Sequence, residues 1–502
     1  MNVQKTPFRT ETALGLKPSE NLVEGRLTVP SEKADIGRVL LVDGKVHANA
    51  EPGDGKVFVE GTVKFFVVYI GPEGNIDSFE SSSPFRHTEN VENAGAGMNV
   101  YAKGSVKEIE YNVEDGRTLY IKGVVYISLN GNVAVTREAV TALDSPDAQV
   151  KTRRMKIASI KGFRQDATAL REDIRIPQNM PRAQKVLYSD AYPVIKSVRN
   201  EDMKIIAEGD VKLMILYLSE DANAPLQYFH ETVPFGSMIA FDNASPGDAV
   251  LSDADLYGLE IEMAEGEGDI LRMSANINVM LSVVSQGEFE TLSDAYSLKN
   301  RLNIRRADCS YVSPVFTGAA KAIARAAITI PEDQSGISRI ICVKASPVIL
   351  TATPYTDRAY LEGLMMFTVC YSSPEGMRGF SGETPFETEV QMEGLMPSHS
   401  IEASAEVEYC SYESAGRDLN VKFMMDVAIK AFETNGFSIV SDVEDTGEAV
   451  PRKKGITIYF SDGGEDVWDI AKRYSTTLDT VRSFNPDLGD SMEQGQKILI
   501  IG

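Results

Sequence analysis

The chain is poor in the residues on which most catalytic and metal sites depend. Its 502 residues include four histidines, four cysteines and one tryptophan. The cysteines have no Cys-x-x-Cys spacing and no histidine beside them, so a zinc site is not expected. The sequence also has no phosphate-binding glycine loop, serine-hydrolase motif or zinc-peptidase motif. We therefore expect no enzyme activity, no cofactor and no metal.

The sequence also lacks an excess of positive charge and long apolar runs. Fifty lysines and arginines stand against 73 aspartates and glutamates, which gives a formal net charge of −23. Nucleic-acid binding, which depends on clustered lysine and arginine, is therefore not expected. No apolar run is long enough for a transmembrane segment, and the residues near Met1 lack the apolar core of a secretory signal. Sparse cysteines, expected to be buried free thiols, suit a reducing compartment.

Four short motifs recur three times in the same order and define an internal repeat. Each copy has an apolar-x-apolar-Pro step, a Glu-Gly pair, a tyrosine eight residues after that glycine, and a Pro-Phe pair. In the first copy these motifs are Pro30, Glu60-Gly61, Tyr69 and Pro84-Phe85. The corresponding residues are Pro177, Glu208-Gly209, Tyr217 and Pro234-Phe235 in the second copy, and Pro331, Glu362-Gly363, Tyr371 and Pro385-Phe386 in the third.

Each copy has the pattern of a β domain. The runs 61–69, 209–217 and 363–371 are almost continuously apolar, which is typical of strands buried on both faces. Alternating segments on both sides of a glycine-bearing turn, such as 106–113 and 117–129, predict hairpins. One short helix is expected at 31–40. We predict a mainly β protein with three tandem β-sandwich-like domains, at 1–150, 151–312 and 313–445, with the repeated tyrosines and phenylalanines in their cores.

The junctions between the copies are basic, for example Lys151–Lys156 and Lys299–Arg306. Two interpretations stay open for them. They are solvated strand edges protected from aggregation by their charge, or they meet acidic faces of neighbouring copies or molecules. The charged segment 442–454 is poor in apolar residues, so we expect a flexible linker there, with 446–454 as the segment before the last domain.

Residues 455–502 have the pattern of a small βααβ domain. Alternation from Ile456 to Phe460 predicts a strand, and an apolar stripe from Val467 to Tyr474 predicts a helix. Thr477 is expected to cap a second helix that ends at Asn485-Pro486. The inward residues of this second helix would be Leu478, Val481 and Phe484. A closing strand is expected at 497–501.

This tail resembles a LysM module in Trp468, Ile470-Ala471, Asn485-Pro486 and Gly495-Gln496. The resemblance implies a ligand groove between two loops, formed by Gly464, Glu465, Asp466, Asn485, Pro486, Asp487 and Leu488. The family usually has Gly-Asp-Thr where this chain has Gly464-Glu465-Asp466. The extra carboxylate weakens the case for a glycan that contains N-acetylglucosamine and leaves room for a protein ligand. Trp468 is expected to pack in the core rather than to form a sugar platform.

Tandem β-rich repeats followed by one LysM module resemble the clostridial spore-coat morphogenesis proteins of the SipL type. The resemblance is carried by the Val29-Pro30, Ile176-Pro177 and Ile330-Pro331 steps, the Glu-Gly and tyrosine runs, and the tail. It implies a protein of the mother-cell cytoplasm at the forespore surface, whose LysM domain binds the ATPase of the coat basement layer or another coat protein. We therefore expect a non-enzymatic structural adaptor in spore envelope assembly.

Two alternatives to this adaptor stay open. One is a protein that binds cortex or wall peptidoglycan through the LysM groove. The other is a surface filament built by strand exchange between the repeats.

Overall fold

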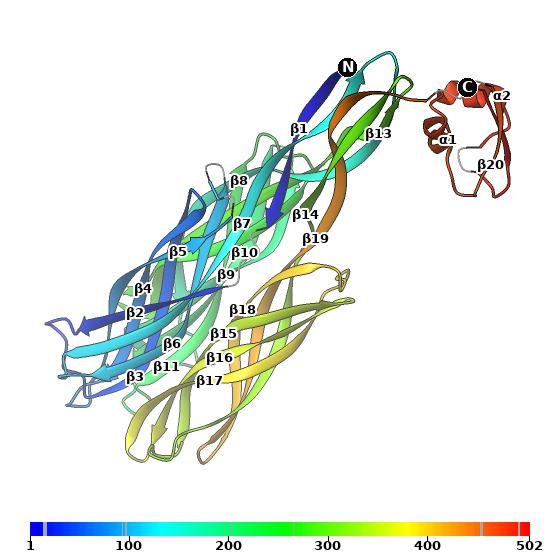
Figure 1. The fold of residues 1–502 in the computed structure, drawn as a ribbon. Coiled ribbons are helices and arrows are strands. Elements are labelled where there is room, and N and C mark those ends of the chain that lie inside the picture. Colours follow the sequence, from blue (N-terminus) through cyan, green and yellow to red (C-terminus); the bar gives the residue numbers. More distant parts are fainter. Residues whose placement is uncertain are drawn as a thin grey trace.

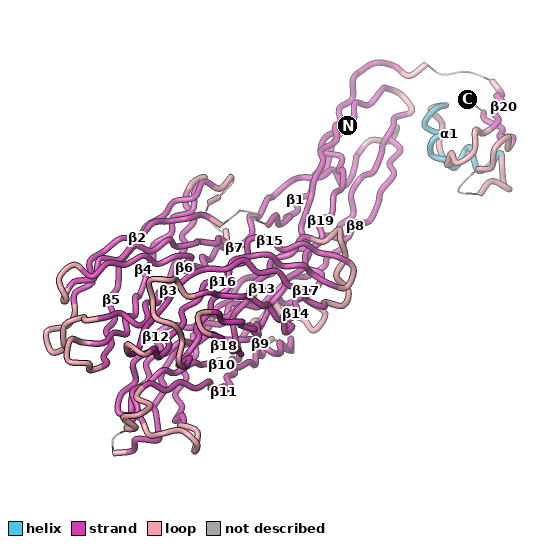
Figure 2. The backbone as a smooth tube through the Cα atoms, turned by 90° about the horizontal axis from the view of Figure 1, so that it is seen from below, coloured by secondary structure: helices cyan, strands magenta, loops and turns pink. Residues whose placement is uncertain are grey.

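The computed structural model describes residues 1–13, 18–92, 94–95, 98–201, 203–264, 266–451, 455–489 and 492–501. It is mainly β, with repeated antiparallel sheets and a small βααβ unit at the C-terminus, and this confirms the predicted fold class (Figures 1 and 2). No helix among these residues is long and apolar enough to cross a membrane.

The body of the molecule consists of three repeats, preceded by β1 (Asn2–Ala13). The first comprises β2 (Ser19–Thr28), β3 (Arg38–Gly53), β4 (Lys56–Ile70), β5 (Ile76–Asn90), β6 (Asn99–Val113) and β7 (Thr118–Asp144). The second comprises β8 (Ala148–Arg175), β9 (Ala183–Glu201), β10 (Lys204–Ser219), β11 (Leu226–Ala240), β12 (Ala249–Ala264) and β13 (Glu267–Ser297). The third comprises β14 (Asn300–Thr329), β15 (Arg339–Tyr355), β16 (Arg358–Ser373), β17 (Gly376–Gln391), β18 (Ser400–Ala415) and β19 (Asp418–Ala449).

Each repeat forms two antiparallel sheets with the same strand order. In the first repeat β4 lies between β3 and β5, and β7 lies between β2 and β6. The equivalent pairs of sheets are β9-β10-β11 with β8-β13-β12, and β15-β16-β17 with β14-β19-β18. In each repeat the apolar residues of both sheets form one core, so the repeats are sandwiches. The predicted hairpins are also present, as β6–β7, β12–β13 and β18–β19.

The recurring glycine and phenylalanine motifs are explained by one contact. Gly61 on β4 lies directly opposite Phe85 on β5, and a Cβ at Gly61 would lie 2.4 Å from the phenyl ring. Only glycine leaves room for the ring to lie across the central strand. The same pairing recurs as Gly209 with Phe235 and Gly363 with Phe386.

The recurring tyrosines are fully buried, as predicted. The hydroxyl of Tyr69 donates to the carbonyl oxygen of Ala34 at 2.8 Å, which ties the central strand to the loop after the proline step. Tyr217 and Tyr371 bond equivalent loops through Pro181 and Ser335. The predicted helix at 31–40 is wrong. This segment is a turn followed by β3, because Leu40 and Leu41 are both buried and their strand pairs with β4.

The strands β7, β13 and β19 extend beyond their sandwiches and pair with β1, β8 and β14 as three two-stranded ribbons. The ribbons pack together into a stalk, which Figure 1 shows leaving the body towards the C-terminal unit. Every layer of the stalk core draws on all three ribbons. One layer contains Phe8, Ala139, Ile157, Cys309 and Ile439, and the next contains Val140, Leu292, Ala295, Val440 and Val443.

The stalk changes how the predicted domain limits are understood. Strands β8 and β14 run unbroken through residues 151 and 313, where the sequence repeats were divided, so the exact boundaries stay a proposal. The prediction of a flexible linker is wrong for residues 442–449. They belong to β19 and pair with β14, because Val443 is buried in the stalk while the acidic residues point outward. Residues 452–454 of that segment lie outside the described residues.

The three sandwiches also share an apolar cluster between them. It includes Leu41, Tyr188 and Cys342, which occupy the same register position in β3, β9 and β15. Equivalent positions meeting at one place indicate an approximate threefold arrangement of the repeats. The four cysteines are free thiols, and three of them are buried, as predicted.

The C-terminal unit follows the predicted order with β20 (Ile456–Phe460), α1 (Val467–Arg473), α2 (Leu478–Phe484) and β21 (Lys497–Ile501). Asp466 caps α1 in a capping box with Asp469, and Thr477 caps α2 as predicted. The prediction that Phe484 faces the core is wrong, since 45% of this residue is exposed. It lies in the last turn of a two-turn helix, where Val481 alone is buried.

Candidate functional site

The residues predicted for the LysM groove lie in two loops of the C-terminal unit, and several of their side chains have internal partners. Glu465 accepts hydrogen bonds from the Tyr459 hydroxyl at 2.7 Å and from the Arg473 guanidinium at 2.5 Å. These bonds, chiefly the one from Tyr459, hold the pKa of Glu465 below its ordinary value. Glu465 therefore joins β20 to α1, and as an ionised, internally bonded group it has little capacity left for a ligand.

Asn485 also has a structural role. Its amide donates to the carbonyl oxygens of Val481 and Leu499, both at 2.7 Å, and its Oδ1 accepts from the Leu499 backbone at 2.8 Å. This arrangement joins the end of α2 to β21. Leu488 packs against the core of the unit, while Gly464, Pro486 and Asp487 are exposed. The groove as a ligand site stays a prediction.

A different surface of the unit is unusually apolar. Ile456, Ile458 and Phe460 project from one face of β20 and are 70%, 51% and 59% exposed. Alternate residues of a strand lie on the same face, so these side chains form a continuous stripe. The alternation of apolar residues is visible in the sequence. Periodicity alone does not show which face of the two-stranded β20–β21 sheet packs on the helices and which faces solvent.

A cavity with a volume of about 1440 Å³ lies between the three repeats. On one side of it Asp253 of β12 accepts from Lys103 of β6 at 2.5 Å and from Lys430 of β19 at 2.9 Å. The hydroxyl of Tyr101 donates to the same carboxylate at 3.2 Å. Burial alone would raise the pKa of Asp253, but the two lysines outweigh it and hold the pKa well below its ordinary value. One carboxylate thus connects all three repeats.

A second charged group lies further along the cavity. Asp43, Asp190 and Lys344 occupy the same position in the three repeats, each opposite the residue three places before the buried tyrosine. Lys344 forms ion pairs with Asp43 and, at 3.8 Å, with Asp190, while Lys45 bonds Asp190 at 2.5 Å. Three like charges at one place would repel one another. The lysine in the third repeat therefore makes the close approach of equivalent positions favourable.

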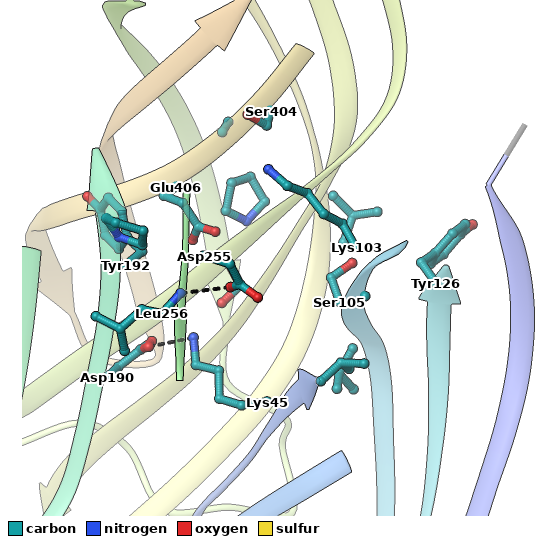
Figure 3. A pocket seen from close by; sticks show the side chains of 18 of the residues that line it. Lys45, Lys103, Ser105, Tyr126, Asp190, Tyr192, Asp255, Leu256, Ser404 and Glu406 are labelled. Carbon is teal, nitrogen blue, oxygen red and sulfur yellow. Dashed lines mark hydrogen bonds and ion pairs between the residues drawn. The ribbon is translucent and has the colours of Figure 1, made fainter. Parts of the chain in front are cut away.

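Figure 3 shows Lys45 directed at Asp190, with Lys103 and Glu406 turned towards the same space. Glu402, Ser404 and Glu406 alternate along β18 and line this cavity. Burial raises the pKa of both glutamates. The arrangement is well suited to joining repeats through buried charge. Sequence reasoning missed it, because its partners come from different repeats and the polar residues of β18 alternate as they would on a solvated strand face.

Comparison with known proteins identifies the repeats. A sequence profile described as the SipL SPOCS domain matches residues 35–114, 182–264 and 336–414. The three matches begin just before β3, β9 and β15. They end within or just after β6, β12 and β18. A search of curated proteins and a search of solved structures each found no match. Three copies of this domain in the order seen here show that the chain is a SipL-type protein, a member of a family of structural proteins of spore coat morphogenesis.

Proposed function

We propose that this protein is a non-enzymatic adaptor in spore envelope assembly that docks coat material at the forespore surface through its C-terminal unit. The unit is proposed to be a LysM module that binds protein, with the coat basement-layer ATPase or another coat protein as its partner. The site of action would be the mother-cell cytoplasm. The three SPOCS domains would supply a rigid body.

The observation that carries this proposal is the apolar stripe of Ile456, Ile458 and Phe460. Large apolar side chains gathered on one exposed face are characteristic of protein interaction sites. Glycan binding by the predicted groove is the alternative, and the internal bonds of Glu465 and Asn485 disfavour it, since those side chains are engaged within the fold. The exposed groove residues Gly464, Pro486 and Asp487 offer a single side-chain charge.

Affinity purification of the full chain from sporulating cells tests the proposal. We expect a coat protein, identified by mass spectrometry, to copurify with the wild-type chain and to be lost with Phe460→Ser. The matched control is Phe58→Ser, because Phe58 is also half exposed, at 48%, but lies on a hairpin of the first repeat. Retention of the chain on muramyl glycan, with equal coat-protein recovery by both variants, would instead support the glycan-binding alternative.

A further inference from the structure

The helical face of the C-terminal unit contacts the end of the stalk. Trp468 of α1 packs edge-on against Tyr296 of β13, with ring centroids 4.9 Å apart. Both residues are buried, which confirms that Trp468 packs in a core, although part of that core is supplied by the body. The Tyr296 hydroxyl donates to the carbonyl oxygen of Thr476 at 2.7 Å, and Leu298 joins the same cluster. Figure 1 shows α1 on the side of the unit that faces the stalk.

The polar half of this contact converges on Asp294. Its carboxylate accepts from the indole N–H of Trp468 at 2.8 Å and from the Lys472 ammonium at 2.6 and 2.7 Å. Burial alone would raise the pKa of Asp294, but the hydrogen bonds from Lys472 and Trp468 outweigh it and leave the pKa below its ordinary value. Both donors belong to the C-terminal unit and the acceptor belongs to the body.

In a second ion pair across the contact, the stalk supplies the cation and the C-terminal unit supplies the carboxylate. Lys151 lies directly opposite Asp294 in the β8–β13 ribbon and bonds Asp466 at 2.5 Å. The ribbon therefore presents one acidic and one basic side chain, and the unit presents their complements. Lys151 belongs to one of the basic junctions, and its partner is an acidic residue of another part of the chain. Neither interpretation of those junctions included the C-terminal unit as the partner.

The stalk residues that make this contact form a short and specific pattern. Asp294 and Tyr296 are two apart in a strand, so they project towards the C-terminal unit, while Ala295 between them packs into the stalk core. Trp468 and Lys472 of α1, together with the Thr476 carbonyl that follows the helix, contact a carboxylate and, two residues later, an aromatic ring with a hydroxyl. Any extended segment with that spacing could present the same groups.

We propose that the C-terminal unit is a binding module for an extended segment that carries an aspartate two residues before a tyrosine. Residues 294–296 of the chain itself occupy this site. A partner with such a segment competes with the stalk and releases the unit from it. The tethered segment has a high effective concentration, on the order of millimolar, so effective competition requires a partner displayed at high local density. The existence of such a partner rests on the proposed function. The contact between the C-terminal unit and the stalk does not depend on it.

The full chain carries its own probe of this contact, because Trp468 is its single tryptophan. Asp294→Asn removes the ionic acceptor, and we expect a several-fold rise in acrylamide quenching of Trp468 and a fall in its fluorescence anisotropy. Lys472→Met, made from the other side, should have the same effect. Asp479→Asn is the matched control, since Asp479 lies exposed at the first turn of α2 in the same unit. Quenching and anisotropy equal to wild type in both Asp294→Asn and Lys472→Met would overturn the docking contact.

A peptide of residues 291–298 tests the recognition itself. Added to the Asp294→Asn chain at up to millimolar concentration, it should restore the protection of Trp468. The same peptide with asparagine at its aspartate should be at least tenfold weaker. Equal effects of the two peptides, or no effect of either, would refute the recognition of this segment even if the stalk contact is real. No coat protein is needed, so this outcome is separate from the success or failure of the copurification.

Discussion

Replacing Asp253 with asparagine tests whether buried charge joins the three repeats. The substitution leaves Lys103 and Lys430 close together without the carboxylate that neutralises them. Removing one partner of a buried ion pair costs about 3–5 kcal/mol. The side chain of Lys103 is 37% exposed and that of Lys430 is 15% exposed, so solvent screens part of the effect. We therefore expect a loss near the lower end, about 3 kcal/mol at pH 7.

The effect of this substitution depends on pH with a definite sign. The two lysines hold the pKa of Asp253 below its ordinary value in the folded chain, despite burial, which alone would raise it. Its stabilising contribution is therefore complete above about pH 4, the ordinary aspartate value, and is lost as the pH falls through the folded-state pKa. The difference between wild type and Asp253→Asn should be constant from about pH 5 to pH 8 and should shrink below about pH 4.

Urea unfolding followed by circular dichroism measures the loss. The first transition is the one to compare, because a chain of three repeats need not unfold in a single step. Asp35→Asn is the matched control. Asp35 pairs with Arg117 at 2.7 Å but is 53% exposed, so its loss should cost less than about 1 kcal/mol. Equal losses in the two variants, or a loss at Asp253 that persists unchanged in acid, would refute the role assigned to this carboxylate.

Three further changes have defined outcomes. Gly209→Ala should lower the stability by about 1–3 kcal/mol, because its Cβ would lie 2.2 Å from the Val194 carbonyl oxygen. Gly236→Ala in the same sheet meets nothing within 4 Å and should change stability by less than about 0.5 kcal/mol, measured by the same urea titration. Glu406→Gln should raise the urea midpoint at pH 7 but not at pH 4, because burial raises the pKa of Glu406 and its ionisation opposes folding only at the higher pH. Thr477→Ala should destabilise α2 by about 1 kcal/mol, seen as faster amide exchange in that helix.

The parts of the fold that could be predicted are those set by local sequence. The predicted cap at Thr477 acts within one turn of its helix, so a short stretch of sequence determines where α2 begins. The repeats were also accessible, because the contact between Gly61 and Phe85 requires specific residues at a fixed spacing and leaves the same pattern in every copy.

The stalk and the cavity could not be predicted, because their partners are far apart in the chain. Lys103, Asp253 and Lys430 come from three repeats, so no local sequence pattern places them together. The sequence predicts a linker at 442–454, because this segment is charged and poor in apolar residues. The pairing of residues 442–449 with β14 and the packing of Val443 against the other two ribbons make that part a strand. The contact between Trp468 and Asp294 was hidden for the same reason, since 174 positions separate the two residues.

The continuous strands of the stalk have a mechanical consequence. Tension on the C-terminal unit would first load the end of β19, where the pairing of Ala449 with Asn300 could open one hydrogen bond at a time. The bonds from Trp468 and Lys472 to Asp294 divert part of that tension into β13, which runs on without interruption into the second sandwich. A pull delivered at one point is thus shared by two ribbons, and we expect the rupture force of the full chain to fall when Asp294 is replaced.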